Sequence, residues 1–242
     1  MSIFKCNKDG KDYFLPVSIL IAALLIGGSV IYSAGKKVEP VKVVENPIDQ
    51  EQQIPEFSYD KIRAVTDEDF ILGDINAPVK IVLYSDTECP YCKRFHITMQ
   101  EIVKKYGNKV AWVYRFMPLD VLHQYARKEA EALACAGDLG GDAKMFAYMD
   151  RIMELTTSND GLEPTELPNI ATYVGIDKTK FVSCLDSGKF AALVEADLQE
   201  AQNAGIMGTP FSVVLGPEGA KDKVEGAYPT TEVSKIIDAM LK

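Results

Sequence analysis

The chain has 242 residues, of which 47% are apolar and 25% are charged, proportions typical of a globular protein. Its net charge is -9 and its pI is near 4.9, so no basic face is available to neutralise a phosphate backbone. Nucleic acid is therefore not expected as a partner. The five cysteines are the feature of the composition that says most about function.

An uncharged, apolar segment runs from Tyr13 to Gly35. At about 1.5 Å per residue, a helix of this length can cross a hydrocarbon core of about 30 Å. We therefore expect residues 13–35 to form a transmembrane anchor or uncleaved signal, preceded by a short cytoplasmic tail at residues 1–12. A buried core helix, or a signal peptide cleaved after Ser33-Ala34-Gly35, is the alternative. The lysines flanking the segment are too evenly divided to fix its orientation.

Residues 36–61 are polar, contain three prolines and show neither helical nor strand periodicity. This composition predicts a flexible tether. We expect the ordered domain to occupy residues 62–242.

A buried strand is predicted at PVKIVLYSD, and it runs directly into the stretch DTECPYCKRF. From Pro90 onwards the apolar residues lie three or four apart, which predicts an amphipathic helix ending at Gly107. Pro90 suits the first turn of this helix, where a missing N–H has no consequence. Cys89 should therefore lie at the helix N-terminus, with Cys92 one turn inside.

The position of Cys89 favours a thiolate, because unpaired N–H groups and the positive end of the helix dipole surround its sulfur. A zinc site would need two further ligands, but there is no second C-x-x-C and the only histidines are His96 and His123. A purely structural disulfide across one turn would remove little unfolded-state entropy. We therefore interpret Cys89 and Cys92 as a redox-active disulfide, and we predict no metal site.

Further along the chain, a second strand is predicted at KVAWVYRF and a block of helices follows it. Strands return at PFSVVLG and near KDKVEGAY, and TTEVSKIIDAML closes the chain as a helix. This order indicates an α/β sheet interrupted by a helical block.

Three stretches carry a family resemblance: GDINAPVKIVLYSDTECPYC, YRFMPLDVLHQYARKEAEALACAG and AGIMGTPFSVV. In this order they resemble the DsbA-like thiol:disulfide oxidoreductases of the thioredoxin superfamily. The resemblance covers about residues 62–242 and implies a thioredoxin-like α/β fold with a helical insertion at about residues 119–203. It implies that Cys89 and Cys92 are catalytic, with the amino end inside the cell and the catalytic domain outside.

By the same resemblance, Pro210 in MGTP is a cis proline that faces the cysteine pair. Backbone groups of Thr209 are then free to bind an extended substrate beside Cys89. Pro90 and Tyr91, between the cysteines, complete the expected supporting residues. A trans proline that simply starts a strand is the alternative for Pro210.

The resemblance implies a monomeric, membrane-anchored enzyme that introduces disulfides into reduced secreted or cell-envelope proteins. It further implies reoxidation by a quinone-linked membrane partner of the DsbB or vitamin K epoxide reductase type, and no organic cofactor. Two other functions stay open from the sequence: a disulfide isomerase or reductase kept reduced by a membrane partner, and a non-catalytic chaperone or adaptor with a thioredoxin fold.

The chain departs from the family at Tyr91, where the best-known members have a histidine whose charge would lie near the thiolate. Glu88 precedes Cys89, and we expect its side chain to be solvated rather than directed at the sulfur. His96 is expected to be a surface or packing residue. His123 is expected near a helix start, without a chemical role.

Cys135 and Cys184 both fall in the helical block, each on an apolar helix face. In an oxidising compartment such a pair tends to bond, and some DsbA-like proteins carry a second disulfide there. We therefore expect a structural disulfide, with two buried free cysteines as the alternative. Cys6 precedes the apolar segment and is expected to remain a reduced thiol.

Overall fold

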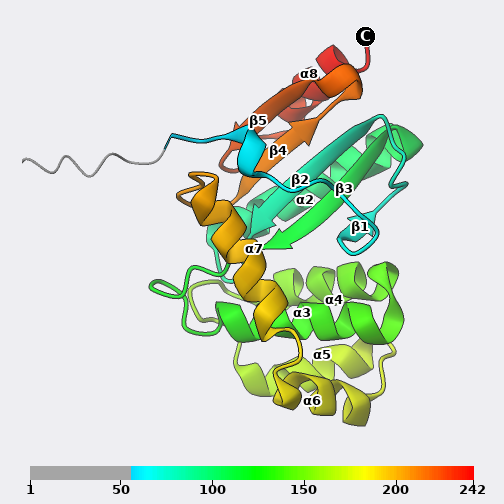
Figure 1. Ribbon diagram of the computed structural model, residues 1–242. Helices are drawn as coiled ribbons and strands as arrows, with labels where there is room; N and C mark the ends of the chain where they lie inside the picture. Colours follow the sequence, from blue (N-terminus) through cyan, green and yellow to red (C-terminus); the bar gives the residue numbers. More distant parts are fainter. Residues whose placement is uncertain (1–55) are drawn as a thin grey trace, which may run out of the picture. The chain divides into compact units, whose positions relative to one another are not determined.

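The computed structural model describes residues 56–242, in which helices surround a five-stranded sheet (Figure 1). The strand order is β1-β3-β2-β4-β5, and only β2 and β3 run parallel to each other. The strands are β1 (Phe70–Leu72), β2 (Val79–Ser85), β3 (Val110–Phe116), β4 (Phe211–Leu215) and β5 (Lys221–Glu225). The four predicted strands are confirmed as β2, β3, β4 and β5, whereas β1 was not predicted.

Side chains of β2 alternate between the two faces of the sheet. Ile81 and Leu83 pack in one core, and Val82 and Tyr84 pack in a second core on the opposite face. The first core includes side chains of α2 (Pro90–Tyr106) and α8 (Thr230–Met240), and the second includes side chains of α7 (Ala191–Asn203). With both faces covered, residues 81–84 of β2 are an uninterrupted apolar run, and four residues after Ser85 separate the strand from α2.

The helical block lies beyond one end of the sheet, where its members pack mainly on one another (Figure 1). They are α3 (Ala126–Gly140), α4 (Asp142–Leu155), α5 (Leu167–Tyr173) and α6 (Lys178–Ser187). The expected insertion at residues 119–203 is too long at its carboxyl end, because α7 packs against β3 of the sheet. The reason is the apolar side of α7, where Val194 faces the first core while Leu198 and Ala201 face the second.

The ordered domain begins earlier than residue 62, so the tether predicted at 36–61 is too long. Phe57 packs on Phe211 with ring centroids 4.8 Å apart. The backbone N–H of Ser58 donates to the carbonyl of Ala204 over 2.9 Å. These aromatic and backbone contacts fix a stretch whose polar composition predicted a flexible chain.

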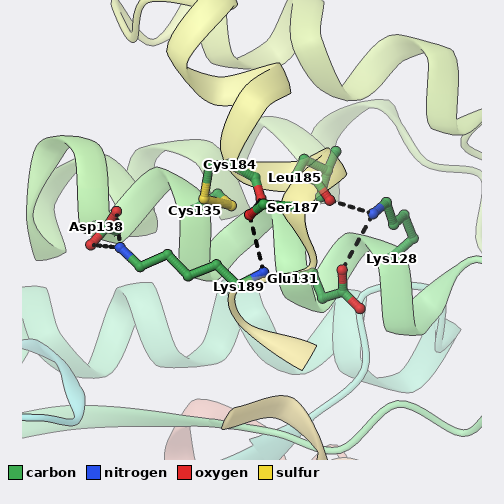
Figure 2. The surroundings of a disulfide bond; sticks show 8 residues. All are labelled: Lys128, Glu131, Cys135, Asp138, Cys184, Leu185, Ser187 and Lys189. Carbon is green, nitrogen blue, oxygen red and sulfur yellow. Dashed lines mark hydrogen bonds and ion pairs between the residues drawn. A yellow bond between two sulfur atoms is a disulfide. The ribbon is translucent and has the colours of Figure 1, made fainter. Parts of the chain in front are cut away.

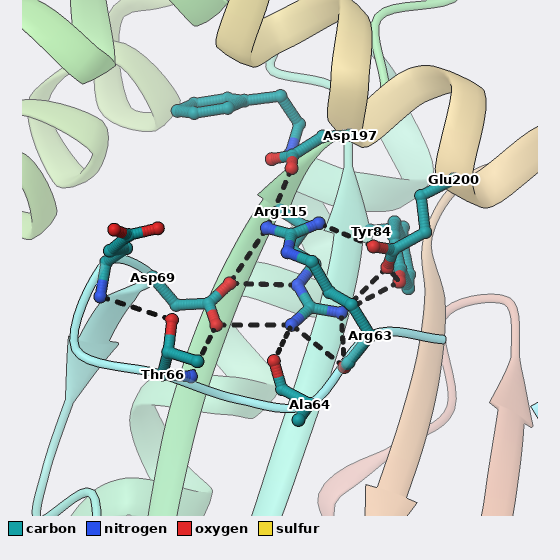
Figure 3. A network of polar contacts seen from close by, with 10 residues as sticks. Arg63, Ala64, Thr66, Asp69, Tyr84, Arg115, Asp197 and Glu200 are labelled. Carbon is teal, nitrogen blue, oxygen red and sulfur yellow. Dashed lines mark hydrogen bonds and ion pairs between the residues drawn. The ribbon is translucent and has the colours of Figure 1, made fainter. Parts of the chain in front are cut away.

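A network of charged side chains joins this amino-terminal segment to the sheet and to α7 (Figure 3). Arg115 of β3 is fully buried, and its guanidinium binds Asp69 over 2.9 Å and Glu200 over 2.7 Å. Arg63 binds Glu200 over 2.7 Å and Asp197 over 2.9 Å. Removing one member of such a buried set leaves an unpaired charge and costs about 3 to 5 kcal/mol.

The predicted transmembrane segment, residues 13–35, lies outside the described residues, as do the predicted tail at 1–12 and Cys6. Among residues 56–242, no helix is both long enough and apolar enough to cross a membrane.

Cys135 of α3 and Cys184 of α6 form a disulfide, the pairing that was expected (Figure 2). On either side of it the two helices are joined by polar contacts. Lys128 donates to the carbonyl of Leu185 over 2.6 Å, and Lys189 binds Asp138 over 2.7 Å. The disulfide therefore links α6 to α3 between two polar contacts, one at Lys128 and one at Asp138.

We predict that the variant Cys135→Ala/Cys184→Ala loses about 4 kcal/mol of unfolding free energy. This value follows from the chain entropy of a loop with a sequence separation of 49 residues. Urea denaturation of the wild type and the variant, both with Cys89 and Cys92 reduced, measures the difference. A loss below about 1 kcal/mol would contradict a stabilising role for this bond.

Candidate active site

The two cysteines of the C-x-x-C motif lie where β2 turns into α2. Cys89 is the N-cap residue of α2, and its backbone N–H donates to the carbonyl of Asp86 over 3.3 Å. Pro90 is the first helical residue, and the helix ends before Gly107, as the apolar spacing predicts. Cys89 retains 4% of its surface exposed and Cys92 only 1%, so the first sulfur is the one closer to solvent.

The two thiols differ strongly in acidity. The pKa of Cys89 is lowered to about 6. The largest cause is a hydrogen bond from the Cys92 side chain, which outweighs the opposing effect of burial. The backbone of Cys92 and Tyr91 and the side chain of Thr209 lower the pKa of Cys89 further. Burial raises the pKa of Cys92 well above its usual value, and the adjacent Cys89 raises it further. At neutral pH the pair therefore carries one thiolate, on Cys89, and one thiol, on Cys92.

The loop before β4 supplies the opposite wall of the site. The peptide bond between Thr209 and Pro210 is cis, the conformation that the family resemblance implies. The thiol of Cys89 approaches the carbonyl of Thr209 at 3.5 Å. The hydroxyl of Thr209 is buried without a hydrogen-bond partner among the described residues, and it lies near enough to the cysteines to lower the pKa of both. The loop thus places both polar groups of Thr209 at the redox pair.

Tyr91, between the two cysteines, points away from the sulfurs. Its side chain is 57% exposed, and the guanidinium of Arg94 lies 5.1 Å from its ring centroid. The residue that departs from the family pattern is therefore part of the outer surface beside the site.

The prediction that Glu88 is solvated is wrong. Its side chain is fully buried, because the loop after α4 folds over it. The hydroxyl of Thr156 donates to one of its carboxylate oxygens over 3.2 Å, and the backbone N–H of Gly161 donates to the other over 2.9 Å. Its own backbone N–H donates to the side chain of Asp86 over 2.8 Å.

A second buried carboxyl, Glu129 of α3, lies beside Glu88 and was not singled out from the sequence. Burial raises the pKa of Glu129 to about 10, and the adjacent carboxylate of Glu88 adds to the shift. The hydroxyl of Thr87 donates to one oxygen of Glu129, while the other oxygen has no hydrogen-bond donor or acceptor assigned among the described residues. Glu129 is therefore protonated at neutral pH.

The two histidines are both buried, with 4% of each exposed. His96 lies one turn beyond Cys92, packs on Trp112 and binds Asp150 over 2.7 Å, so the prediction of a packing residue is confirmed. His123 lies shortly before the start of α3, as predicted, and binds Asp86 over 2.9 Å. Within residues 56–242, no cluster of three or more His, Cys, Asp or Glu side chains is placed to hold a metal ion.

Comparison with known proteins decides the fold family. The thioredoxin family matches residues 65–239, most of the chain. The chain belongs to the thioredoxin family. The α/β fold with a helical insertion, predicted from the motifs, is thereby confirmed.

Among solved structures, DsbA2 of Pseudomonas aeruginosa is similar, with 26% identity and a TM-score of 0.63 over 73% of this chain and 96% of that one. BdbD of Bacillus subtilis, at 21% identity, shares the fold, with a TM-score of 0.61 over 76% of this chain and 95% of that one. A Rickettsia felis protein named "Putative protein-disulfide oxidoreductase" is 28% identical over 82% of this chain and 70% of its own length. The resemblance to DsbA-like oxidoreductases within the thioredoxin family is thus confirmed.

Other relatives are longer. A Salinispora arenicola protein named Na(+)/H(+) antiporter NhaA 1 is 32% identical over 151 residues, 62% of this chain and 22% of that protein. The chain therefore spans only about a fifth of the antiporter relatives that it matches.

We predict that, in the reduced protein, iodoacetamide modifies Cys89 with a half-maximal rate near pH 6 and leaves Cys92 unmodified at neutral pH. The reason is that only the Cys89 sulfur is a thiolate there, and the thiolate is the nucleophile. Peptide mass mapping after short exposures across pH 4 to 9 measures both rates. Comparable modification of the two cysteines at neutral pH would show that the difference in acidity is not present.

We also predict that Glu129 makes the protein less stable as the pH rises. An unfolded glutamate has a pKa of about 4.3, whereas the folded value is about 10, so the folded protein holds an extra proton between them. Its stabilising effect is complete below pH 4.3 and is lost as the pH rises toward 10, by up to about 1.4 kcal/mol per pH unit.

Urea denaturation between pH 6 and 9, in a Cys89→Ser/Cys92→Ser background where these thiols cannot titrate, measures this slope. Glu129→Gln should remove most of it, because the amide is neutral at every pH. Glu163→Gln, at an exposed carboxylate, serves as the matched control and should leave the slope unchanged. If Glu129→Gln keeps the full slope, Glu129 is already ionised in the folded protein.

Proposed function

We propose that this protein is an extracytoplasmic dithiol oxidase that introduces disulfides into reduced secreted or cell-envelope polypeptides through Cys89 and Cys92. The observation that carries the proposal is the low pKa of Cys89, about 6, at the start of α2. A stabilised Cys89 thiolate stabilises the reduced enzyme, and this makes the Cys89–Cys92 disulfide a stronger oxidant.

The reaction begins with the enzyme disulfide intact. A substrate thiolate attacks the sulfur of Cys89, the Cys89–Cys92 bond breaks, and Cys92 takes up a proton as the thiol favoured by its burial. A second substrate thiolate then attacks the substrate sulfur of the mixed disulfide. Cys89 leaves as a thiolate, so the substrate gains a disulfide and the two electrons remain on the enzyme dithiol.

An apolar groove that includes Met207, two residues before Thr209, supports an extended polypeptide as substrate. Next to the Thr209 loop lies a groove of about 490 Å³ lined mainly by apolar side chains. Three of them are unusually exposed: Val121 at 98%, Leu122 at 68% and Met207 at 68%. Exposed apolar patches of this kind mark interaction sites, and unfolded substrates present matching side chains. Reoxidation is proposed to come from a quinone-linked membrane partner of the DsbB or vitamin K epoxide reductase type.

Two features support a location outside the cytoplasm, with residues 13–35 as a single membrane span. The Cys135–Cys184 disulfide is of the kind that persists in oxidising compartments. The uncharged segment 13–35 is long enough to cross a membrane. Protease added to spheroplasts should therefore remove the catalytic domain, and a protected domain would contradict this location.

The direction of the reaction is tested by the reduction potential of the Cys89/Cys92 couple in glutathione buffers. We expect a value less negative than about -200 mV, on the oxidising side of thioredoxin at about -270 mV. In parallel, the oxidised enzyme should restore activity to reduced, unfolded ribonuclease, and Cys89→Ser should abolish this activity. A potential near that of thioredoxin would favour a reductase. Exchange activity that survives Cys89→Ser would remove Cys89 from the mechanism.

A further inference from the structure

Asp86, the residue that follows β2, contacts both cysteines through its backbone. Its N–H donates to the sulfur of Cys92 over 3.5 Å, and its carbonyl accepts from the N–H of Cys89 over 3.3 Å. The side chain is only 2% exposed. A carboxylate is therefore buried directly behind the redox pair, where its negative charge would oppose a thiolate.

Two backbone groups hydrogen-bond the Asp86 carboxylate and favour its ionised form, although burial leaves its pKa above the usual value. The N–H of Glu88 donates to one oxygen and the N–H of Leu119 donates to the other, each over 2.8 Å. Burial raises the pKa of Asp86, while these hydrogen bonds and His123 counteract the rise. The site thus needs a positive charge to offset Asp86 when Cys89 is a thiolate.

His123 is placed to supply a positive charge at this point. Its Nδ1 atom lies 2.9 Å from the Asp86 carboxylate, and its backbone N–H donates to the carbonyl of Leu119 over 2.9 Å, which fixes the ring. Burial lowers the pKa of His123, but the hydrogen bond and charge of Asp86 outweigh it, and Cys89 and Asn159 raise the pKa further. The ring is thus paired with Asp86 and lies near enough to Cys89 for the charge of the thiolate to act on it.

The other cationic side chains near the start of α2 are engaged elsewhere. The Lys93 ammonium donates to the carbonyl of Thr156, and the Arg94 guanidinium lies over the exposed ring of Tyr91. His96 is bound to Asp150. The negative charge of Asp86 also acts on two other acidic groups nearby, because it contributes to the raised pKa values of Glu129 and Tyr114.

We propose that His123 is a positioning residue whose charge neutralises Asp86 and thereby keeps Cys89 in its thiolate form, setting the oxidising strength of the Cys89–Cys92 pair. It takes the place of the histidine that other DsbA-like proteins carry between their cysteines and that is Tyr91 here. The proposal rests on the proposed thiol–disulfide exchange. In that reaction Cys89 must leave as a thiolate when the mixed disulfide is resolved, and a less basic leaving group departs faster.

The first test compares His123→Gln with His96→Gln, a control that removes an imidazole of equal burial that is also paired to an aspartate, the half-exposed Asp150. Absorbance at 240 nm follows the Cys89 thiolate against pH, and glutathione buffers give the reduction potential. We expect His123→Gln to raise the Cys89 midpoint by about one pH unit, a tenfold decrease in the ionisation constant of the thiol. The potential should fall by about 30 mV, the equivalent of tenfold for two electrons.

In contrast, His96→Gln should leave both values at those of the wild type. Equal behaviour of the two variants overturns the proposal. The titration of Cys89 does not require any exchange activity. A wild type that fails to oxidise substrates therefore refutes the proposed function, without affecting this comparison.

The second test asks whether neutralisation of Asp86 is the cause. In the double variant Asp86→Asn/His123→Gln both charges are absent, so the Cys89 midpoint should return toward the wild-type value. A midpoint as high as in His123→Gln alone would contradict the proposal, because the missing imidazole would then act by some other route than Asp86.

A third measurement uses the unaltered protein and does not depend on the folding of any variant. If the His123 cation stabilises the thiolate, the thiolate stabilises the cation equally, since coupling between two sites is reciprocal. NMR titration of the ring should give a higher pKa for His123 in the reduced protein than in the oxidised protein. His96 serves as the internal reference and should titrate alike in both. Equal pKa values of His123 in the two redox states would overturn the proposal.

Discussion

The redox chemistry of this protein depends on one turn, the four residues that lead from β2 into α2. The hydrogen bond from Cys89 to the Asp86 carbonyl closes this turn and brings the Cys89 sulfur to the open end of the helix. There, the orphan N–H groups of the first helical turn and the Cys92 thiol stabilise a thiolate. Because β2 is central in the sheet and packed on both faces, the turn has little freedom to relax.

Several acidic side chains are gathered at the same turn. Asp86 and Glu88 are both buried, and Glu129 approaches from the insertion. Three negative charges here would make the Cys89 thiolate unfavourable. The structure avoids this by protonating Glu129, by binding Glu88 to the loop after α4, and by pairing Asp86 with His123. The helical insertion therefore covers the site and also contributes to its electrostatics.

Local patterns predicted local features well. The apolar spacing after Pro90 gave the start and end of α2, and the uninterrupted apolar runs gave β2 and β3. The burial of Glu88 could not be read from its neighbours, because its partners Thr156 and Gly161 are about 70 residues away along the chain.

Long-range packing also explains the two boundaries that were predicted wrongly. The contacts of Phe57 and Ser58 with the far end of α7 and with β4 order a segment that is polar in composition. The sequence of α7 shows a helix but not which layer it joins, since both sides of α7 carry apolar residues. In the acid cluster, the buried position of Glu129 in an otherwise alanine-rich helix face was the available signal.

The charged network around Arg115 helps to fix the position of residues 56–63 relative to the active site. Arg63 is bound to α7 through Asp197 and Glu200, and Ser58 is bound just beyond the end of the same helix. Helix α7 leads within a few residues to the Thr209 loop that faces Cys89. Residues 56–63 and the face that carries the thiolate are therefore parts of one rigid body. Among residues 56–242, no loose connection separates residue 56 from the sulfur, so Cys89 keeps a fixed direction relative to residue 56.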